Sequence, residues 1–249
     1  MNPNPRALSA SFSILVVLTV VALAISAWPW FQPVELPRNA ETPGLKQSLE
    51  RVRLVSARPE VPGYARDKFG SGWRARPRGC TTRQAVIAGQ LAHVTATPRC
   101  RLLTGIGRDP YSGNWMSVPD GGIEIDHVFA LSAAWDMGAA DWEPRQRIRF
   151  ANDAANLVAV SREENQDKLD QLPAQWLPSS SPARCWYSRR VAGVAADWQL
   201  ALTHADARAM RRACRTHAVT GAVTAPVRIV LSSQYAVGRT LSRRRHNLA

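Results

Sequence analysis

Alternation of apolar and polar residues predicts two short strands near the middle of the chain. Between positions 123 and 131, every second residue from Ile123 to Phe129 falls on one face of an extended segment. Residues 156–160 (NLVAV) are a second candidate strand, and 101–104 are a third. We expect a short antiparallel hairpin within this part of the chain.

Capping residues and periodicity predict helices around these strands. Ser161 and Glu164 have the spacing of a capping box, which starts a helix that runs from 162 to about 171. Further helices are expected at 45–55, from Thr81 or Thr82 to 93, at 132–135, at 144–151 after a cap at Asp141, at 183–198 and at 205–215. The expected fold class is therefore α+β, in a mostly helical domain.

The N-terminal segment is uniformly apolar. Arg6 precedes an uncharged run over 7–34, and the run is densest at 14–25. A short positive start, an apolar stretch and small residues after it are typical of a signal peptide. The run also reaches the roughly 20 residues that cross a bilayer. We therefore expect residues 1–31 to be a signal peptide or an N-terminal membrane anchor, in which 7–31 would cross the membrane. Either alternative places the rest of the chain outside the cytoplasm.

Composition divides the remaining chain into three parts. Residues 32–62 are rich in proline, and we expect a linker there, with 45–55 as its one short helix. The patterned region at 63–216 is the expected domain. In residues 217–249 the periodic pattern fades, and glycine, threonine, proline and serine with three successive arginines at 243–245 predict a low-order basic tail.

The chain is strongly basic, with a formal net charge of +13. Its cationic residues are almost all arginine, which favours bidentate contacts with phosphate. A nucleic acid, an anionic membrane or an anionic cell wall is therefore a candidate partner. A genome that encodes arginine in place of lysine explains the same composition.

Four cysteines agree with an exported protein, in which disulfides persist. None lies in a Cys-x-x-Cys pair, which argues against a zinc ribbon. Three pairings are possible. We predict Cys80–Cys100 and Cys185–Cys214, because each joins near neighbours, and each closed loop would contribute about 3 kcal/mol.

The candidate chemistry lies between positions 124 and 168. Asp126 and Asn165 provide hard oxygen ligands of the kind that Mg²⁺ prefers. His127 is a base that accepts a proton near neutral pH. An asparagine amide such as Asn156 can orient the imidazole ring. These parts predict metal-assisted hydrolysis of a phosphodiester.

One geometric requirement follows from the strand. Asp126 and His127 are adjacent, so in a regular strand their side chains point to opposite faces. Both serve one site only where the strand ends, bulges or turns. We expect such an irregularity at this point.

The same residues carry a resemblance to HNH (ββα-metal) nucleases. The chain is especially similar to the branch formed by the C-terminal domain of GmrSD restriction endonucleases and its small exported bacterial relatives. The similarity covers about 63–215. Its motifs are Gly79-Cys80-Thr81-Thr82-Arg83, Asp109-Pro110-Tyr111-Ser112-Gly113, Glu124-Ile125-Asp126-His127, Ala134-Trp135-Asp136, Asn152-Asp153 with Asn156-Leu157, Asn165 with Lys168, and Trp176-Leu177-Pro178.

The resemblance implies a role for each matching residue. His127 would be the general base, Asn156 would orient it, and Asp126 and Asn165 would bind the metal ion. Glu124 and Lys168 would be supporting residues, behind the ligands or on a phosphate. In two places the chain departs from the pattern: Thr81 stands where the branch often has an acid, and 128–155 is longer than in minimal HNH units.

We therefore expect an exported HNH-type endonuclease that cleaves DNA with Mg²⁺ or another divalent cation such as Mn²⁺. The alternative is a secreted, non-catalytic module of the same fold that binds nucleic acid or the cell wall. A zinc hydrolase is disfavoured, because the chain contains neither a His-x-x-x-His pair nor a close cysteine pair.

Overall fold

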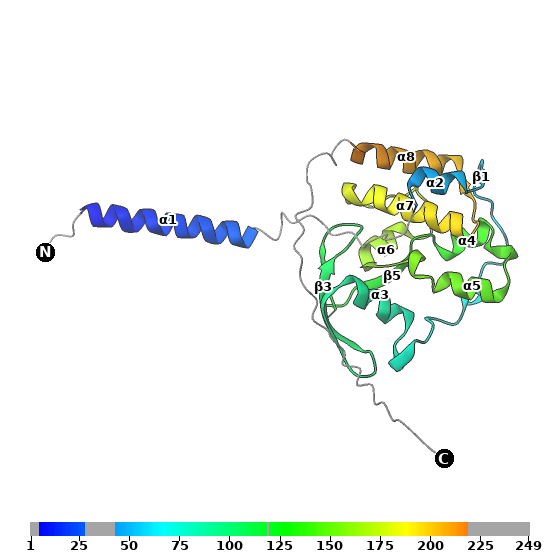
Figure 1. Cartoon of the computed structure of the whole chain (residues 1–249), viewed down its shortest axis with the longest axis horizontal. Coiled ribbons are helices and arrows are strands. Elements are labelled where there is room, and N and C mark those ends of the chain that lie inside the picture. Colours follow the sequence, from blue (N-terminus) through cyan, green and yellow to red (C-terminus); the bar gives the residue numbers. More distant parts are fainter. Residues whose placement is uncertain (1–4, 28–42, 119, 219–249) are drawn as a thin grey trace, which may run out of the picture.

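The structure, a computed structural model, describes residues 5–27, 43–118 and 120–218 (Figure 1). The expected signal or anchor segment falls on α1 (Pro5–Ala27) and on residues outside these ranges. Among the described residues, no helix is long and apolar enough to cross a membrane. The predicted basic tail lies outside the described residues from 219 onward.

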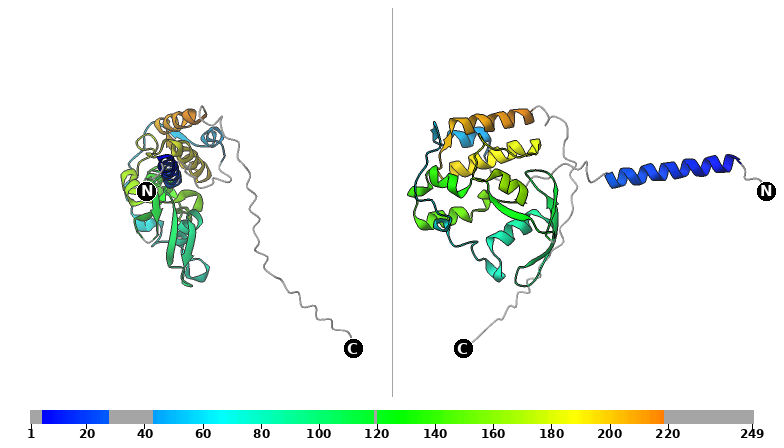
Figure 2. Two further views of the ribbon diagram at one scale, coloured as in Figure 1. Left: turned by 90° about the vertical axis from the view of Figure 1, so that its left-hand side faces the viewer. Right: turned by 180° about the vertical axis from the view of Figure 1, so that it is seen from behind.

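A layer of helices forms one side of the body. It contains α2 (Leu45–Glu50), α7 (Ser181–Asp197) and α8 (His204–Ala218), which lie side by side in Figures 1 and 2. Helix α7 is buried along most of its length and packs against α2 and α8. The main core lies beneath this layer and includes α4 (Leu131–Asp136).

The expected linker does not extend to position 62. Leu49 and Val52 are buried in the main core. Strand β1 (Leu54–Val55) pairs in parallel with β7 (Leu202–Thr203). The prolines and charged residues of this segment predicted a linker, but α2 packs against α7 and α8.

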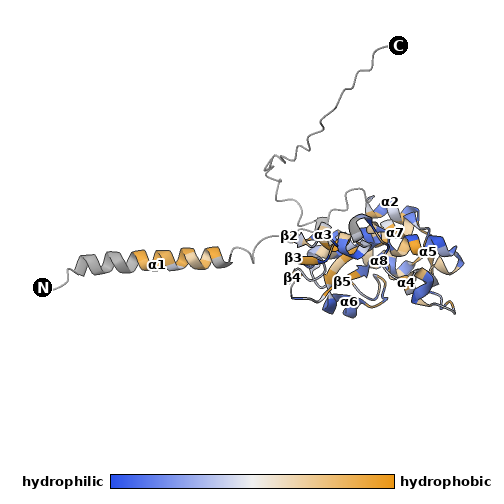
Figure 3. Cartoon of the chain, turned by 90° about the horizontal axis from the view of Figure 1, so that it is seen from below, coloured by the Kyte–Doolittle hydropathy of each residue, from blue (hydrophilic) through white to orange (hydrophobic). Residues whose placement is uncertain are grey.

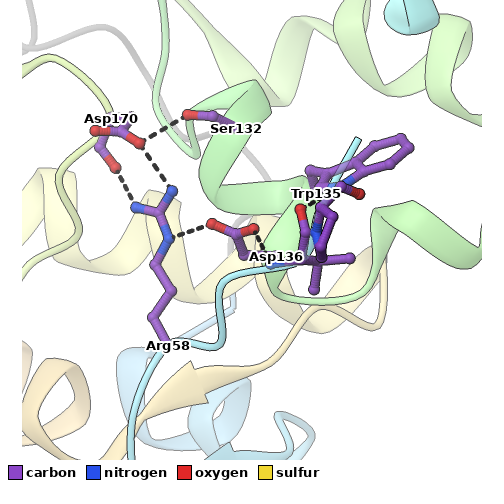
Figure 4. A network of polar contacts seen from close by, with 7 residues as sticks. Arg58, Ser132, Trp135, Asp136 and Asp170 are labelled. Atoms are coloured by element: carbon purple, nitrogen blue, oxygen red, sulfur yellow. Dashed lines mark hydrogen bonds and ion pairs between the residues drawn. The ribbon is translucent and has the colours of Figure 1, made fainter. Parts of the chain in front are cut away.

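Arg58 then fixes the next residues to the body. Its guanidinium bridges Asp136, at 2.7 Å, and Asp170, at 2.8 Å, as Figure 4 shows. The second oxygen of Asp136 accepts a hydrogen bond from the Val61 amide. The indole N–H of Trp135 donates to the Val61 carbonyl at 3.1 Å. The two aspartates thus hold this segment beside α4.

The predicted hairpin forms near the middle of the body. Strands β5 (Ile123–His127) and β6 (Leu157–Ser161) pair antiparallel along their full length. Ser161 Oγ accepts a hydrogen bond from the Glu164 amide, and α6 (Arg162–Lys168) follows directly. Helix α6 packs against both strands and is hydrophilic throughout, as its blue colour in Figure 3 shows. It ends at Lys168, where Leu169 has a positive φ of 52°, so it is shorter than predicted.

A second sheet was only partly predicted. It contains β2 (Ala92–Ala96), β3 (Leu102–Arg108) and β4 (Trp115–Ser117) in the order β2-β3-β4. Helix α3 (Thr82–Gln90) ends before 93, because β2 begins two residues later. The β5–β6 pair and α3 enclose a smaller core, which includes Ile87, Ile125 and Leu157. The overall fold is α+β, as expected.

The long connection between β5 and β6 carries helices, as predicted. These are α4, the 3-10 turn η4 (Ala139–Asp141), α5 (Pro144–Ala151) and the 3-10 turn η5 (Ala154–Asn156). The residue before α5 is Glu143 rather than Asp141. Pro144 accounts for this difference, because proline is favoured at the first helical position. The remaining 3-10 turns are η2 (Arg66–Phe69) and η3 (Pro77–Gly79).

Both predicted disulfides are confirmed. Cys80–Cys100 joins the start of α3 to the turn between β2 and β3, with a Cα–Cα distance of 5.0 Å. Cys185–Cys214 joins α7 to α8, with a Cα–Cα distance of 4.5 Å. No free cysteine is present in the described residues.

Candidate active site

A hollow of about 460 Å³ lies beside β5 and the end of α6. Asp126, His127 and Asn165 all line it. Glu124, Asn156 and Lys168 do not belong to its lining. The structure thus brings three of the six expected site residues to one hollow and places the other three behind or beside it.

His127 is the last residue of β5, so the strand ends where we expected an irregularity. The pairing with β6 contains no bulge up to that residue. The partners of Asp126 and His127 come from different elements, as expected for adjacent residues of a strand. Both residues reach the hollow because the strand stops there.

Two donors hold the Asp126 carboxylate. Tyr111 donates its hydroxyl to Oδ2 at 2.6 Å, and Lys168 donates its ammonium to Oδ1 at 2.9 Å. Burial raises the pKa of Asp126, while Lys168 and Tyr111 act to lower it. Burial, followed by the charge of Asp126, raises the pKa of Tyr111 well above its ordinary range. Tyr111 therefore keeps its proton and remains a donor.

Lys168 is fully buried, although an isolated helical lysine is usually solvated. Its ammonium contacts Asp126 and also donates to the His127 carbonyl at 3.0 Å. This position supports the two site residues from behind. It does not place the ammonium where a phosphate in the hollow would lie.

Glu124 determines how the Asn165 amide is oriented. A carboxylate only accepts hydrogen bonds, so the group of Asn165 that faces Glu124 is its NH₂. The Nδ2–Oε2 distance is 2.7 Å. The amide oxygen of Asn165 is thereby left available as a ligand. Arg162 holds the other oxygen of Glu124 at 3.1 Å.

The His127 ring has one nitrogen engaged. Nε2 lies 2.9 Å from the Ala151 carbonyl oxygen, which can only accept, so Nε2 carries the proton. Trp73 stacks on the ring with 5.7 Å between centroids and 12° between planes. Burial lowers the pKa of His127 to about 4, and the charges of Arg66 and Lys168 act in the same direction. The ring is neutral at pH 7, and Nδ1 can accept a proton.

The lowered pKa of His127 predicts a loss of stability in acid. The pKa falls from its ordinary 6.5 to about 4 on folding, so the unfolded chain binds this proton first. The contribution of neutral His127 to the free energy of unfolding is therefore fully present above about pH 6.5 and is lost as the pH falls toward 4. Over that window it amounts to about 3 kcal/mol of unfolding free energy.

Urea denaturation at pH 7 and pH 4.5 measures this contribution. Between these pH values the wild type should lose about 2–3 kcal/mol more than the variant His127→Gln, which has no group that titrates there. Equal losses in the two proteins would show that His127 is not buried in the neutral form.

The Asn156 side chain hydrogen-bonds the backbone of Phe129 and not the His127 ring, contrary to the orienting contact that we expected. Its side chain pairs with the backbone of Phe129, with distances of 2.7 Å to the amide and 3.1 Å to the carbonyl oxygen. Arg190 holds the adjacent turn through the carbonyls of Ala154, Ala155 and Leu157. Asn156 therefore holds the backbone that follows β5, while Ala151 and Trp73 fix the orientation of the His127 ring.

Three residues of the site were given no role from the sequence. Tyr111 was named only within the motif Asp109-Pro110-Tyr111-Ser112-Gly113, yet its hydroxyl donates to Asp126. Trp73 and Arg66 lie more than 50 positions before His127. Arg66 is exposed and lines both the 460 Å³ hollow and a smaller one of about 180 Å³ on the Trp73 side of His127. The motif that contains Tyr111 was the only sequence signal for any of the three.

The oxygen donors that line the hollow fit a metal site that water and substrate would complete. Within the described ranges, no group of three or more His, Cys, Asp or Glu side chains could hold a metal ion. A closed zinc site would need such a group. One carboxylate from Asp126 and one amide oxygen from Asn165 instead fit Mg²⁺, which keeps several waters and takes further oxygens from substrate phosphates.

Comparisons with known proteins identify the family of this domain. Residues 89–213 match the family described as GmrSD restriction endonucleases, C-terminal domain. The chain is also 36% identical over 204 residues to an uncharacterized secreted protein of Arthroderma benhamiae, a match that spans 80% of this chain and 96% of that protein. No solved structure matches the chain significantly. The chain belongs to the family of the GmrSD restriction endonuclease C-terminal domain.

Proposed function

We propose that the protein is an exported endonuclease that hydrolyses DNA phosphodiester bonds with water activated by His127. The observation that carries this proposal is the convergence of Asp126, His127 and Asn165 on one hollow. Membership in a family described as restriction endonucleases supports a nuclease-like domain. The two disulfides and the secreted relative support an extracellular location.

In this proposal His127 is the general base. Its Nδ1 takes a proton from water, which attacks phosphorus in line with the leaving oxygen. The resulting positive ring keeps its Nε2–H bond to the Ala151 carbonyl, which stabilises the charge. Arg66, exposed at the edge of both hollows, provides a cation for the phosphate.

Asp126 and Asn165 would hold the divalent cation, Mg²⁺ or Mn²⁺. When bound, this ion would act as a Lewis acid toward the phosphate and the leaving oxygen. Lys168 and Tyr111 keep Asp126 in place, and Glu124 aims the Asn165 oxygen. In this reading β5, β6 and α6 form the ββα-metal motif.

Plasmid digestion with and without metal tests the proposal. We expect nicking or linearisation in Mg²⁺ or Mn²⁺ and none in EDTA. Asn165→Ala, which removes one ligand, should raise the Mg²⁺ concentration for half-maximal cleavage about tenfold or more. The matched control is Gln47→Ala, which removes an exposed side-chain amide from α2, outside the lining of the hollow. Cleavage that persists undiminished in EDTA would contradict the metal-dependent mechanism.

A non-catalytic binding module is the second candidate. The observation in its favour is that Tyr111 and Lys168 already engage both oxygens of Asp126. Such a module would retain DNA, or anionic cell-wall polymer, in EDTA. It would not cleave DNA in the presence of any divalent ion. Salt-sensitive binding without cleavage would therefore favour it.

A further inference from the structure

A third hollow, of about 680 Å³, lies between the segment Gly70–Ala75 and α5. Its charged lining residues are Arg74, Arg145 and Arg149. Among the described residues that line it, none is acidic. We call this feature the arginine groove and define it by these three residues.

None of the three guanidinium groups has a hydrogen bond or ion pair with another described residue. Arg147, between two of them on α5, behaves differently. Its guanidinium donates to carbonyl oxygens of the body, among them Lys68 at 3.2 Å and Trp142. The fold therefore uses Arg147 internally and leaves Arg145 and Arg149 exposed, one helical turn apart.

Like charges that share a hollow repel one another, and at positions i and i+4 of a helix they lower its stability. An anion between them removes this repulsion. Guanidinium groups bind phosphate oxygens through paired N–H donors. Cations on both walls of the groove match the successive charges of a chain of phosphates better than they match one isolated anion.

The groove adjoins the candidate active site. Gly70, Gly72 and Trp73 line both the groove and the 180 Å³ hollow that contains His127 and Arg66. Trp73 stands between the two hollows with its ring parallel to that of His127. A bound strand that leaves the active site past Trp73 would enter the arginine groove.

We propose that the arginine groove binds consecutive phosphates of the nucleic-acid strand on one side of the bond that is cleaved. This inference rests on the proposed function for the position of that bond. Binding of DNA to the groove requires no catalysis and can be measured separately from cleavage.

The test is DNA binding by the full chain in EDTA, with fluorescein-labelled single-stranded and duplex DNA of 20 nucleotides per strand as probes. The variant is Arg145→Gln with Arg149→Gln, and the control is Arg208→Gln with Arg211→Gln. The control pair removes the same charge from exposed positions of α8, which lies far from α5 in Figures 1 and 2. Arg74→Gln tests the opposite wall separately.

The groove pair should weaken binding of at least one probe roughly tenfold to a hundredfold at 0.1 M salt. It should also reduce the slope of log K against log salt by about two, one for each phosphate contact. Arg74→Gln should reduce the slope by about one. Wild type that binds neither probe, or a groove pair that binds like the control pair, would overturn the inference.

Hydrolysis of bis(p-nitrophenyl) phosphate in Mg²⁺ separates this inference from the proposed function. This small diester does not reach the groove, so the groove pair should hydrolyse it at the wild-type rate. Binding that the groove pair weakens and the control pair does not, without hydrolysis of DNA or diester, would refute the nuclease and support the groove. Normal hydrolysis with no difference between groove and control pairs would refute the groove alone.

Discussion

Replacement of His127 with alanine should reduce the rate of DNA cleavage by about 10²–10⁴-fold, the usual contribution of a general base. The physical reason is the location of the ring at the end of β5. Its Nδ1 is free to accept a proton, and its Nε2–H is fixed by the Ala151 carbonyl. The measurement is the initial rate of plasmid nicking at saturating Mg²⁺ and pH 7, per mole of folded protein.

Two further variants separate catalysis from structure. His127→Gln retains a side-chain N–H that can reach the Ala151 carbonyl but has no basic nitrogen, so it should recover stability and remain inactive. His204→Ala removes an exposed histidine at the start of α8 and should cut at the wild-type rate. An active His127→Gln would show that the ring only packs and that another group activates the water.

Replacement of Lys168 with methionine should lower the unfolding free energy by about 3–5 kcal/mol. Lys168 is fully buried, and Asp126 is 4% exposed, so the variant leaves a buried carboxylate without its cation. Burial already raises the pKa of Asp126, and loss of Lys168 should raise it further. The variant should therefore bind a proton at Asp126 and lose affinity for a metal ion as well as stability. Urea denaturation at pH 7 measures the first effect.

The matched control is Lys46→Met, because the Lys46 side chain is 92% exposed and its contact with Glu50 is 3.9 Å long. We expect a change of less than about 0.5 kcal/mol there. The double variant Asp126→Asn with Lys168→Met should be more stable than the sum of the single changes predicts, because it removes both charges together. Strict additivity would mean that the buried pair is not coupled.

The local elements of the site follow from the sequence because they depend on near neighbours. Alternation from Ile123 onward specifies a strand, and the Ser161–Glu164 spacing specifies the start of α6. Both disulfides join cysteines fewer than 30 positions apart. The identity of the candidate base and ligands also follows from the sequence, because only certain residue types can perform that chemistry.

Contacts between distant segments could not be predicted from the sequence. Lys168 was expected as a supporting residue, but a helical lysine is exposed or buried according to what packs over it. Here Asp126 and the end of β5 cover it. Asn156 was expected to orient the His127 ring, and the structure instead joins it to the backbone of Phe129. Each difference depends on where a hydrogen-bond partner lies in space.

The sequence by itself determined the α+β class, the strand–strand–helix order and the residue types of the candidate site, and it favoured the disulfide pairs that the structure contains. Only the tertiary structure decided that residues 45–62 pack onto the body, that Trp73 and Arg66 flank His127, and that Arg74, Arg145 and Arg149 share a groove. The physical reason is the distance along the chain over which each kind of interaction acts. Caps, strand alternation and short loops act over a few bonds, whereas burial depends on all the surfaces that meet when the chain folds.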